Sequence, residues 1–415
     1  MGFTKNVLAP CAIGVALLVP ALAAYSTHLS PGLRPTMQFG VAELEGVGIP
    51  EAPPGPTLRS FADRSFQRGF ERWFDAAYGG RNLLVRFNNE WLYRLFRRSN
   101  VSNDRIVVGK DETLFARKAI DTWVRPLGGR RRLENFVAEL ALLQKEAEAR
   151  GIPFVFVVTP DKALIYEELL PEQARRFGLN LSWRKLLLRA LRSQGLRFVD
   201  GHEITARLVR SEGLQAFNPG GIHWNRIAAM HTWNAAIRVL NEQTDRPFSE
   251  VRVSDVSLRE PRPREGDFRE LLNLLDTSYG FLVPGGTFHP TRPELTRRGV
   301  LLMNGGSFCR EFLELSGSAE IFARIRYFRY ARDLLLPPDP KRHRVGDLRA
   351  TLWETESDRP DAILIENNQA VIFRGLKRFM RALQSRLREI PEVPDRRPGG
   401  NVEYQSPRIS SSPDR

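Results

Sequence analysis

The chain has 415 residues, and its 42% apolar content excludes a wholly disordered protein and allows a core of ordinary size. Two cysteines exclude a disulfide-rich fold, and the lack of any repeat of about 20–50 residues argues against a solenoid or propeller. The net charge of +14 favours an anionic partner such as an acidic polysaccharide or lipid headgroups. The alternative is a solvated basic surface without a partner. Because the charge is spread along the chain, we expect no nucleic-acid partner.

Residues 7–25 form an uncharged apolar stretch that follows Lys5. Such a stretch is just long enough to cross a bilayer as a helix, and residues 21–23 (Ala-Leu-Ala) resemble a signal-peptide cleavage site. We therefore expect residues 1–25 to be a membrane anchor or a cleaved signal, with the rest of the chain exported. Residues 26–58 are rich in Pro and Gly and are expected to be a linker.

Two amphipathic stretches follow, with large apolar residues at helical spacing. The first contains Phe66, Phe70, Trp73, Phe74 and Ala77, and the second contains Leu84, Phe87, Trp91 and Leu95. We expect both apolar faces to be packing faces and not a ligand site. Together with a short strand at 106–109, they would form an N-terminal extension, residues 59–130, that packs on the core.

Residues 131–388 alternate between helical and strand patterns, which predicts an α/β domain. The continuous apolar run at 153–159 is typical of a strand buried on both faces. We predict further strands at 196–199, 299–303, 321–328 and 362–365, and helices at 132–149, 183–194, 225–240, 309–316 and 369–388. A Pro- and Arg-rich excursion at 255–296 should hold one helix, 268–275, and the tail, 389–415, should be disordered.

The strongest local motif runs from the predicted strand at 299–303 through Asn304, Gly305 and Gly306 to Ser307 and a predicted helix. Two glycines permit a sharp turn that lifts a serine hydroxyl above the carboxyl edge of a sheet. The first N–H groups of the next helix would then stabilise an oxyanion beside it. We interpret Ser307 as a nucleophile, with a simple helix N-cap as the alternative.

A second motif delivers His223 from a turn-forming run directly before a predicted helix, next to Trp224. A histidine placed in this way can act as a general base towards a serine. The alternative is a structural histidine at a loop–helix junction. His202, which follows Asp200 at a strand end, is the second choice of base.

Several pieces of the chain, in this order, resemble the SGNH-hydrolase-like proteins related to the alginate O-acetyltransferases. Besides the N-terminal apolar segment, the matching pieces are residues 81–96, 107–111, 114–115, 159–163, 166, 170–171, 223–225, 266–268, 271–272 and 306–308. Their shared order makes the resemblance more specific than any single piece. The resemblance implies a three-layer SGNH-hydrolase-like α/β sandwich with a mainly parallel sheet as the catalytic domain, 131–388. It also implies a periplasmic protein, anchored in the inner membrane or released by cleavage.

The resemblance further implies a serine-dependent O-acetyltransferase that acts on an exopolysaccharide through an acyl-serine intermediate, with Ser307 as nucleophile and His223 as general base. The expected partners are an exopolysaccharide acceptor, the inner membrane, and a multipass membrane O-acyltransferase that supplies the acetyl group. We expect no metal and no cofactor. Oxyanion and substrate contacts are predicted for four further residues, with turn formation or core packing as the alternative: Gly306, Asn304, Asn367 and Trp224.

The sequence departs from the family pattern where the catalytic acid is expected. The usual Asp-x-His appears with Gly221 in the place of the aspartate, and the usual Gly-Asp-Ser appears with Gly306 before Ser307. A misoriented histidine can lower the rate by about 10⁴. Three explanations are open: a backbone carbonyl orients the histidine, Asp200 or Asp267 replaces the acid, or activity has been lost.

Two other functions therefore remain alternatives. One is a non-catalytic polysaccharide-binding or assembly subunit on a degenerate SGNH-like fold. The other is a carbohydrate esterase, which runs the same steps with water as the acceptor. An exported lipid- or nucleic-acid-binding protein would rest on the net charge alone.

Overall fold

The structure is a computed structural model that describes residues 43–47, 55–77, 81–101, 105–124, 129–339, 341–368 and 376–393. These residues divide into two compact units. Unit 1 comprises the described residues up to Arg117 together with Pro219–Ile222 and Pro261–Phe281. Unit 2 comprises the described residues of Lys118–Asn218, His223–Glu260 and those from Leu282 onward. Unit 1 therefore gathers three separate segments, a division that the sequence does not reveal.

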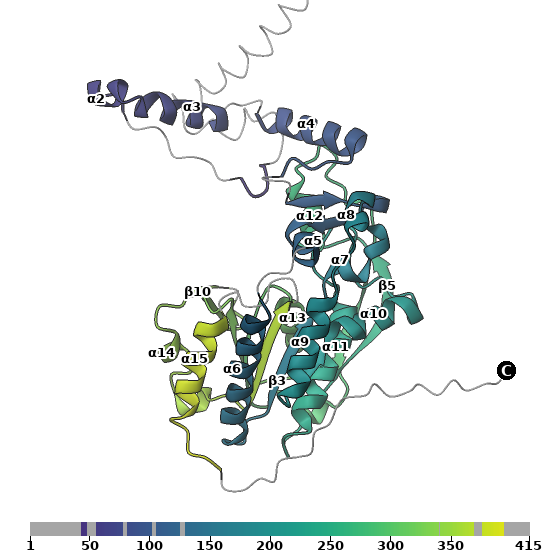
Figure 1. The fold of residues 1–415 in the computed structure, drawn as a ribbon, viewed down its shortest axis with the longest axis vertical. Helices are drawn as coiled ribbons and strands as arrows, with labels where there is room; N and C mark the ends of the chain where they lie inside the picture. The colour runs from purple at the N-terminus through teal and green to yellow at the C-terminus, as the bar shows by residue number, and fades with distance from the viewer. Residues whose placement is uncertain are drawn as a thin grey trace, which may run out of the picture. The chain divides into compact units, whose positions relative to one another are not determined.

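Unit 2 is built on a seven-stranded, mainly parallel sheet with the strand order β10-β9-β8-β7-β11-β3-β4 (Figure 1). Only β9 and β10, at one edge, run antiparallel to their neighbours. The strands are β3 (Phe154–Thr159), β4 (Phe198–Asp200), β7 (Val300–Gly305), β8 (Arg324–Arg329), β9 (Asp333–Leu335), β10 (His343–Arg344) and β11 (Ala362–Asn368). The carboxyl ends of β3, β7, β8 and β11 therefore meet along one edge of the sheet.

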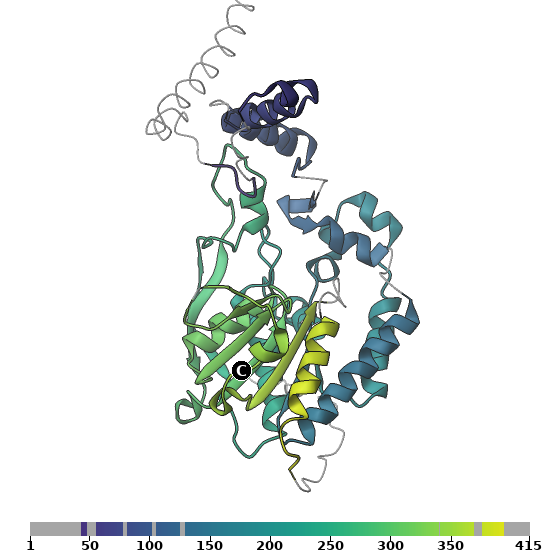
Figure 2. The ribbon, with the colours of Figure 1, turned by 90° about the vertical axis from the view of Figure 1, so that its left-hand side faces the viewer.

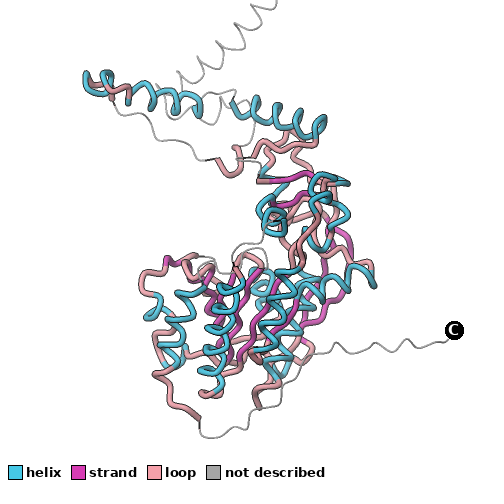
Figure 3. Tube along the Cα trace, in the orientation of Figure 1, coloured by secondary structure: helices cyan, strands magenta, loops and turns pink. Residues whose placement is uncertain are grey.

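The central strands are apolar throughout because both faces of the sheet are covered. In β3, Phe154 and Phe156 pack into one hydrophobic cluster while Val155 and Val157 pack into the other, as the two-residue period of a strand requires. β7 and β11 divide their side chains in the same way. The result is a three-layer sandwich, in which helices lie on the sheet (Figures 2 and 3) and one hydrophobic cluster fills each of its two faces.

The helices of one layer are α6 (Arg130–Glu148), α9 (Ser182–Ser193), α14 (Leu348–Thr351) and α15 (Leu376–Leu387), which supply the first cluster. The other layer is formed mainly by α11 (Arg226–Asn241) and α13 (Cys309–Ser318). The other α-helices described in this part of the chain are α5 (Arg117–Val124), α7 (Lys162–Ile165), α8 (Glu172–Phe177) and α10 (Gly201–Glu212). The predicted α/β sandwich with a mainly parallel sheet is thus confirmed.

Most strands and helices predicted for 131–388 are present, with ends shifted by a few residues. The predicted excursion at 255–296 differs, because much of it belongs to an antiparallel hairpin of β5 (Val251–Arg259) and β6 (Val283–Pro290). The predicted helix there is shorter, α12 (Asp267–Leu271). β6 is hard to predict from the sequence, because it contains Pro284, Pro290 and two glycines, which are uncommon in strands. Its stability comes from pairing with β5.

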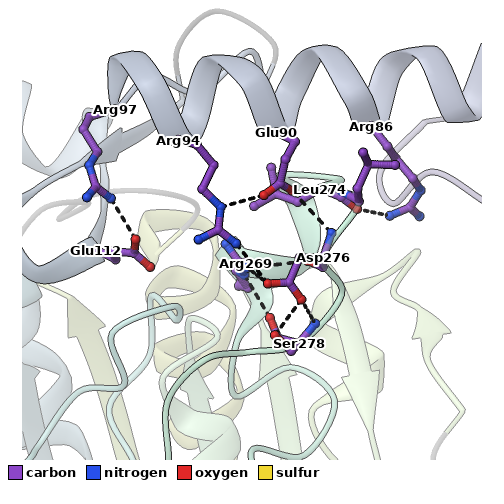
Figure 4. Close-up of polar contacts among 10 residues, drawn as sticks. Arg86, Glu90, Arg94, Arg97, Glu112, Arg269, Leu274, Asp276 and Ser278 are labelled. Carbon is purple, nitrogen blue, oxygen red and sulfur yellow. Dashed lines mark hydrogen bonds and ion pairs between the residues drawn. The ribbon is translucent and has the colours of Figure 1, made fainter.

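Unit 1 contains α2 (Leu58–Ala62), α3 (Ser65–Ala77), α4 (Arg81–Phe96), α12 and the strand pair β1 (Ile106–Val108) and β2 (Leu114–Ala116). Its small core joins Tyr93 of α4, residues of β1 and β2, and Phe268, Leu272 and Leu274. α4 is held to the 269–278 segment by polar contacts, drawn in Figure 4. The prediction that Leu84, Phe87, Trp91 and Leu95 form a packing face is wrong, because all four are more than half exposed.

The apolar stretch 7–25, much of the linker 26–58 and the tail beyond residue 393 lie outside the described residues. No described helix is both long enough and apolar enough to cross a membrane. The anchor or signal at the N-terminus, and the disordered tail, therefore stay predictions.

Candidate active site

Ser307 lies on the turn that links β7 to α13, at the carboxyl edge of the sheet. Gly305 is required in this turn, because a Cβ there would lie 2.5 Å from Glu366 Oε2 and still closer to Cys309 Sγ. The helix begins at Cys309 with Phe308 as its N-cap, and no side chain caps it. The Ser307 hydroxyl therefore does not serve as a helix cap and is available for other contacts.

His223 reaches the same edge from the loop that precedes α11. Asn225 holds this loop, since its side chain accepts a hydrogen bond from Ala228 N at 2.9 Å and its backbone N–H donates to Ala216 O at 2.8 Å. The His223 ring packs edge-on against the Phe308 ring at 5.2 Å. Two independent contacts, the N-cap and the aromatic pair, thus fix the direction of the imidazole.

The structure brings the two main predicted residues together. His223 Nε2 and Ser307 Oγ are 2.7 Å apart, which is hydrogen-bonding distance, although 84 residues separate them in the chain. Both side chains are partly buried, so a substrate can reach the pair. This arrangement can transfer a proton from the hydroxyl to the imidazole, as a serine nucleophile requires.

Tyr330 is a third residue at this pair, and sequence reasoning missed it. Its Oη accepts a hydrogen bond from Ser307 N at 3.2 Å, and its O–H donates to Ser307 Oγ at 3.3 Å. Tyr330 follows β8, the neighbour of β7, and the backbone of Tyr330 and Ala331 is left-handed, with φ of +54° at both. Such a conformation costs about 1 kcal/mol or more for a residue with a side chain, and strain of this kind is often found at functional sites.

Glu366 lies beneath the nucleophile turn and was also missed. This fully buried carboxylate accepts hydrogen bonds from Gly306 N at 2.6 Å and Thr159 Oγ1 at 2.5 Å, and from Cys309 Sγ at 3.6 Å. Burial raises the pKa of Glu366, although the hydrogen bonds from Thr159 and Gly306 act in the opposite direction. Glu366 therefore ties the turn to β11 and β3 from below.

Two predicted oxyanion groups are already used in this structure. The Gly306 N–H donates to Glu366, and the Gly306 carbonyl accepts from the Tyr327 hydroxyl. Asn304 is buried and donates its side-chain amide to Phe328 O at 2.9 Å, which joins β7 to β8. Asn304 thus acts as a sheet-end contact, and Tyr330 supplies the hydroxyl that lies beside Ser307.

Asn367 lines a small cavity next to the turn, together with Gly306, Tyr330 and Glu366. The cavity is about 20 Å³, enough for one water molecule. Asn367 is buried, and its Oδ1 has no hydrogen-bond partner among the described residues. The predicted role of Asn367 in binding stays a prediction, and its position beside Gly306 is compatible with it.

Trp224, in contrast, is a core residue. Only 1% of its surface is exposed, and its ring packs against Phe308 and Phe312 at 5.8 and 5.5 Å. Its Nε1 donates to Phe308 O at 3.4 Å. Because neither face of the ring is open, the packing alternative describes Trp224 better than sugar stacking.

Asp200, the predicted substitute acid, is engaged elsewhere. It caps α10 by accepting from Glu203 N at 3.2 Å, and its other oxygen pairs with Arg184. The second-choice base, His202, is also in α10, and burial lowers its pKa to about 3. An imidazole with that pKa is too weakly basic to be useful near neutral pH.

Asp267 lies against the two residues that precede His223. Its Oδ1 accepts a hydrogen bond from Ile222 N at 2.9 Å. A Cβ on Gly221 would lie 3.6 Å from the same oxygen and only 2.5 Å from the carbonyl oxygen of Glu265. Asp267 thus occupies space close to where an aspartate at position 221 would extend, and position 221 itself has no room for a side chain.

No cluster of three or more His, Cys, Asp or Glu side chains is arranged to hold a metal ion within the described ranges. The site therefore consists of Ser307, His223 and Tyr330 at the sheet edge, with Glu366 below the turn. The sequence signals for Glu366 and Tyr330 are weak. Glu366 is a charged residue near the end of an apolar strand, and Tyr330 is a tyrosine just after a strand. The parallel sheet makes them meaningful by bringing the strand ends together.

The chain is similar to known proteins in the region that contains His223. Residues 106–293 match the family model described as the SGNH hydrolase-like domain of acetyltransferase AlgX. The match covers a little under half of the chain and ends before Ser307. No curated protein matches the chain in sequence.

Solved structures to which the chain is similar include three bacterial proteins. The O-acetyltransferase domain of Pseudomonas putida AlgJ is 14% identical, with 68% of this chain and 98% of that chain covered and a TM-score of 0.45. Pseudomonas aeruginosa AlgX is 19% identical, with 68% and 67% covered and a TM-score of 0.46. Bacillus cereus PatB1 is 12% identical, with 64% and 96% covered and a TM-score of 0.42.

The family match agrees with the fold and with the resemblance seen in the sequence. The sheet is mainly parallel, helices cover both of its faces, and a serine and a histidine meet at its carboxyl edge. Residues 106–293 are therefore similar in sequence to the SGNH hydrolase-like domain of acetyltransferase AlgX.

Proposed function

We propose that the protein is a serine-dependent O-acetyltransferase that transfers an acetyl group to a polysaccharide hydroxyl through an acyl-serine. The observation that carries the proposal is the 2.7 Å separation of Ser307 Oγ and His223 Nε2. The match to an acetyltransferase family model supports the choice of acetyl as the transferred group. Fold alone would not support a function, because SGNH-like folds carry several chemistries.

In the first half-reaction His223 Nε2 takes the proton of Ser307 Oγ while Oγ attacks the carbonyl carbon of the donor. The tetrahedral intermediate collapses when the bond to the donor oxygen breaks, and His223 returns the proton to that leaving oxygen. In the second half-reaction His223 takes the proton of a sugar hydroxyl, which attacks the acetyl-serine. Collapse releases the acetylated sugar and returns the proton to Ser307.

Tyr330 is the side-chain donor we assign to the oxyanion. Its hydroxyl lies 3.3 Å from Ser307 Oγ, close to the place where the negative charge develops. Glu366 has a different role, because it holds the Gly306 N–H and with it the shape of the turn. A preorganised donor lowers the barrier because it does not have to reorient during the reaction.

Asp267 is the carboxylate that we propose stabilises the backbone before His223. Its hydrogen bond to Ile222 N fixes the residue bonded to His223. Asp200 is less suitable for a role at this loop, because α10 and Arg184 already use its oxygens. Position 221 itself leaves no room for an aspartate.

The acceptor we propose is an exopolysaccharide outside the cytoplasm, and the acetyl donor is a multipass membrane O-acyltransferase. The motivation is the family resemblance together with the apolar N-terminal stretch, and the net charge of +14 suits an acidic glycan. In this proposal the protein is anchored in the inner membrane with its catalytic domain in the periplasm, or is released there by cleavage.

Trapping of the acyl-enzyme tests the nucleophile. The full chain is mixed with a chromogenic acetyl ester, quenched, and examined by mass spectrometry for one added acetyl group on the peptide that contains Ser307. We expect Ser307→Ala to abolish the adduct and to lower turnover by about 10⁴ or more. Ser318→Ala, at the exposed end of α13, is the matched control. It should form the acetyl adduct and turn over the ester like the wild type.

The same assay separates the alternatives. Equal turnover by wild type and Ser307→Ala would remove the nucleophile assignment. An acyl-serine that passes its acetyl group only to water, with polysaccharide present, would indicate an esterase. Glycan binding without an acyl-serine under any donor would indicate a non-catalytic subunit.

A further inference from the structure

Helix α4 is oriented with its polar face inward. Its buried side chains are Arg86, Asn89 and Tyr93, which are 7%, 8% and 1% exposed. On the opposite side lie five large apolar residues that are 42–59% exposed and that we call the outer stripe: Leu83, Leu84, Phe87, Trp91 and Leu95. The apolar face that would normally cover a core is thus directed to the surroundings.

Specific contacts fix this orientation. Arg86 donates to Leu274 O at 2.8 Å and to Glu43 O at 2.9 Å, and Asn89 donates to Leu272 O at 2.9 Å. Figure 4 shows Arg86, Glu90, Arg94 and Arg97 all directed from α4 toward the same side. Rotating the helix to bury the outer stripe would break these bonds and leave the carbonyl oxygens of Leu272 and Leu274 without these donors, which is costly.

The preceding helices add a second apolar surface. Phe61, Phe66, Phe70 and Trp73 of α2 and α3 form a row in which successive rings are 4.9–6.0 Å apart. α2 has no buried residue, and Leu58 at its start is 94% exposed. Leu58 and Phe61 of α2 are therefore exposed in the same unit as the outer stripe.

The charge of this region points to the kind of surface that it contacts. Residues 57–98 contain nine arginines and four acidic residues, a net charge of +5 in a tenth of the chain. Arg64, Arg68, Arg72 and Arg98 are exposed in this region. Leucine and aromatic side chains flanked by arginines are typical of helices that lie in the interface of an anionic bilayer.

Length and polarity exclude a spanning mode for α4. Its 16 residues extend about 24 Å, less than the roughly 30 Å hydrocarbon core, and its inner face holds buried Arg86 and Asn89. A helix of this kind can only lie along the surface, with the outer stripe immersed and the inner face held by the protein. The apolar stretch at 7–25 would, as an anchor, keep these helices near a membrane and raise their local concentration there.

We propose that the outer stripe of α4 docks on the surface of a membrane containing anionic lipid. Burial of the apolar outer stripe holds the helix in the interfacial layer of the membrane. The arginines attract the anionic headgroups. The occupant is the lipid surface and not a second copy of the chain, because a self-complementary contact would bring the arginine-rich regions of two copies together. This docking does not rest on the chemistry of Ser307.

Quenching of tryptophan by brominated acyl chains tests the proposal. The full chain is reconstituted into phosphatidylcholine vesicles with brominated chains, with and without phosphatidylglycerol. Subtracting the emission of Trp91→Phe from that of the wild type isolates the signal of Trp91 and removes any contribution of residues 7–25. We expect the anionic vesicles to quench the Trp91 signal at least about twofold, and about 1 M salt to weaken this quenching.

Two variants make the test specific. Leu84→Glu/Phe87→Glu should abolish the quenching, because two charges enter the outer stripe. Leu142→Glu is the matched control, since Leu142 is 56% exposed on α6 of unit 2 and should leave the quenching unchanged. Ser307→Ala should also quench like the wild type, so that failure of the docking and failure of the catalytic proposal are told apart.

Two outcomes would overturn the proposal. One is a Trp91 signal that brominated anionic vesicles do not quench. The other is quenching that persists in Leu84→Glu/Phe87→Glu. If Trp91 is not quenched and the wild type is a dimer that the double variant converts to monomer, the stripe is covered by a second copy and the lipid assignment is wrong.

Discussion

Helices α4 and α9 have similar compositions but turn opposite faces to the protein. α9 buries one tryptophan and three leucines and exposes Lys185, Arg189 and Arg192. α4 buries Arg86 and Asn89 and exposes its outer stripe. The difference shows that apolar periodicity identifies the residues that share a face, whereas the neighbours determine which face is turned inward.

The neighbours of the two helices explain the contrast. α9 lies on the hydrophobic cluster that covers one face of the sheet, where only apolar side chains gain by burial. α4 lies against a segment whose carbonyl oxygens, at Leu272 and Leu274, need donors. An arginine and an asparagine are therefore the stabilising inner residues of α4.

The most direct way to break this comparison is to truncate one leucine in each helix. Leu187→Ala removes a fully buried side chain and should lower the free energy of unfolding by about 2–5 kcal/mol. Leu84→Ala removes a side chain that is 59% exposed and should change it by less than about 0.5 kcal/mol. Urea unfolding followed by circular dichroism measures both, and equal losses would mean that the outer stripe is buried.

Asp161 is a buried carboxyl group in the sandwich, and its effect on stability can be compared with that of the buried polar side chains of α4. Burial raises the pKa of Asp161, the N-cap of α7, from 3.8 to about 6. The native state then binds the proton more tightly than the unfolded state, so the carboxyl lowers stability as the pH rises from about 4 to 6. Two pKa units correspond to about 3 kcal/mol.

Asp161→Asn keeps the oxygen that accepts from Ala163 N and removes the charge. We expect it to be more stable than the wild type at pH 7, by at most about 3 kcal/mol, and nearly equal at pH 4. Urea unfolding at both pH values measures this, and Asp121→Asn, exposed on α5, is the control. A variant that is less stable at pH 7 would show that the burial of Asp161 is compensated by other groups.

In unit 1 the corresponding test concerns a carboxylate that acts through hydrogen bonding. Asp267→Ala removes the acceptor for Ile222 N and loosens the backbone before His223, and we expect kcat to fall by about 10² or more, with little change in KM. Asp200→Asn should retain activity within a factor of about three, because its capping oxygen remains. The reverse order of the two effects would assign the acid to Asp200.

The smallest effect is expected for Glu366 in the sandwich. In Glu366→Gln one carboxylate oxygen becomes an amide, so either Gly306 N or Thr159 Oγ1 loses its acceptor. We expect kcat to fall about tenfold, with acyl-serine still formed, because the turn is loosened but Ser307 and His223 remain. Glu314→Gln on α13 is the control, and equal kcat values would mean that Glu366 does not position the turn.

The sandwich could be predicted from the sequence where burial alone determines the pattern. β3 and β7 are continuous apolar runs, and α6 and α11 have apolar residues at helical spacing. The hairpin of β5 and β6 could not be predicted, because β5 is mostly exposed and β6 contains prolines and glycines. Its stability is a property of the pair and leaves little trace in either segment.

The candidate site could be predicted only where a local sequence pattern marks the residue. Ser307 and His223 follow local turn signals that place them at the ends of secondary structure elements. Tyr330 depends on two consecutive left-handed residues that are not glycine, and Glu366 depends on donors from two other strands. Neither arrangement has a local sequence signature, because distant segments create it.

The crowding around Gly221 has a consequence for anyone who wishes to rebuild the family's usual Asp-x-His arrangement. Glu265 O would lie 2.5 Å from a new Cβ, so Gly221→Asp collides with backbone and not with a movable side-chain tip. Reinstalling the aspartate therefore requires redesigning the 262–267 loop in the same step. A substitution at position 221 alone therefore does not restore the family's aspartate in this chain.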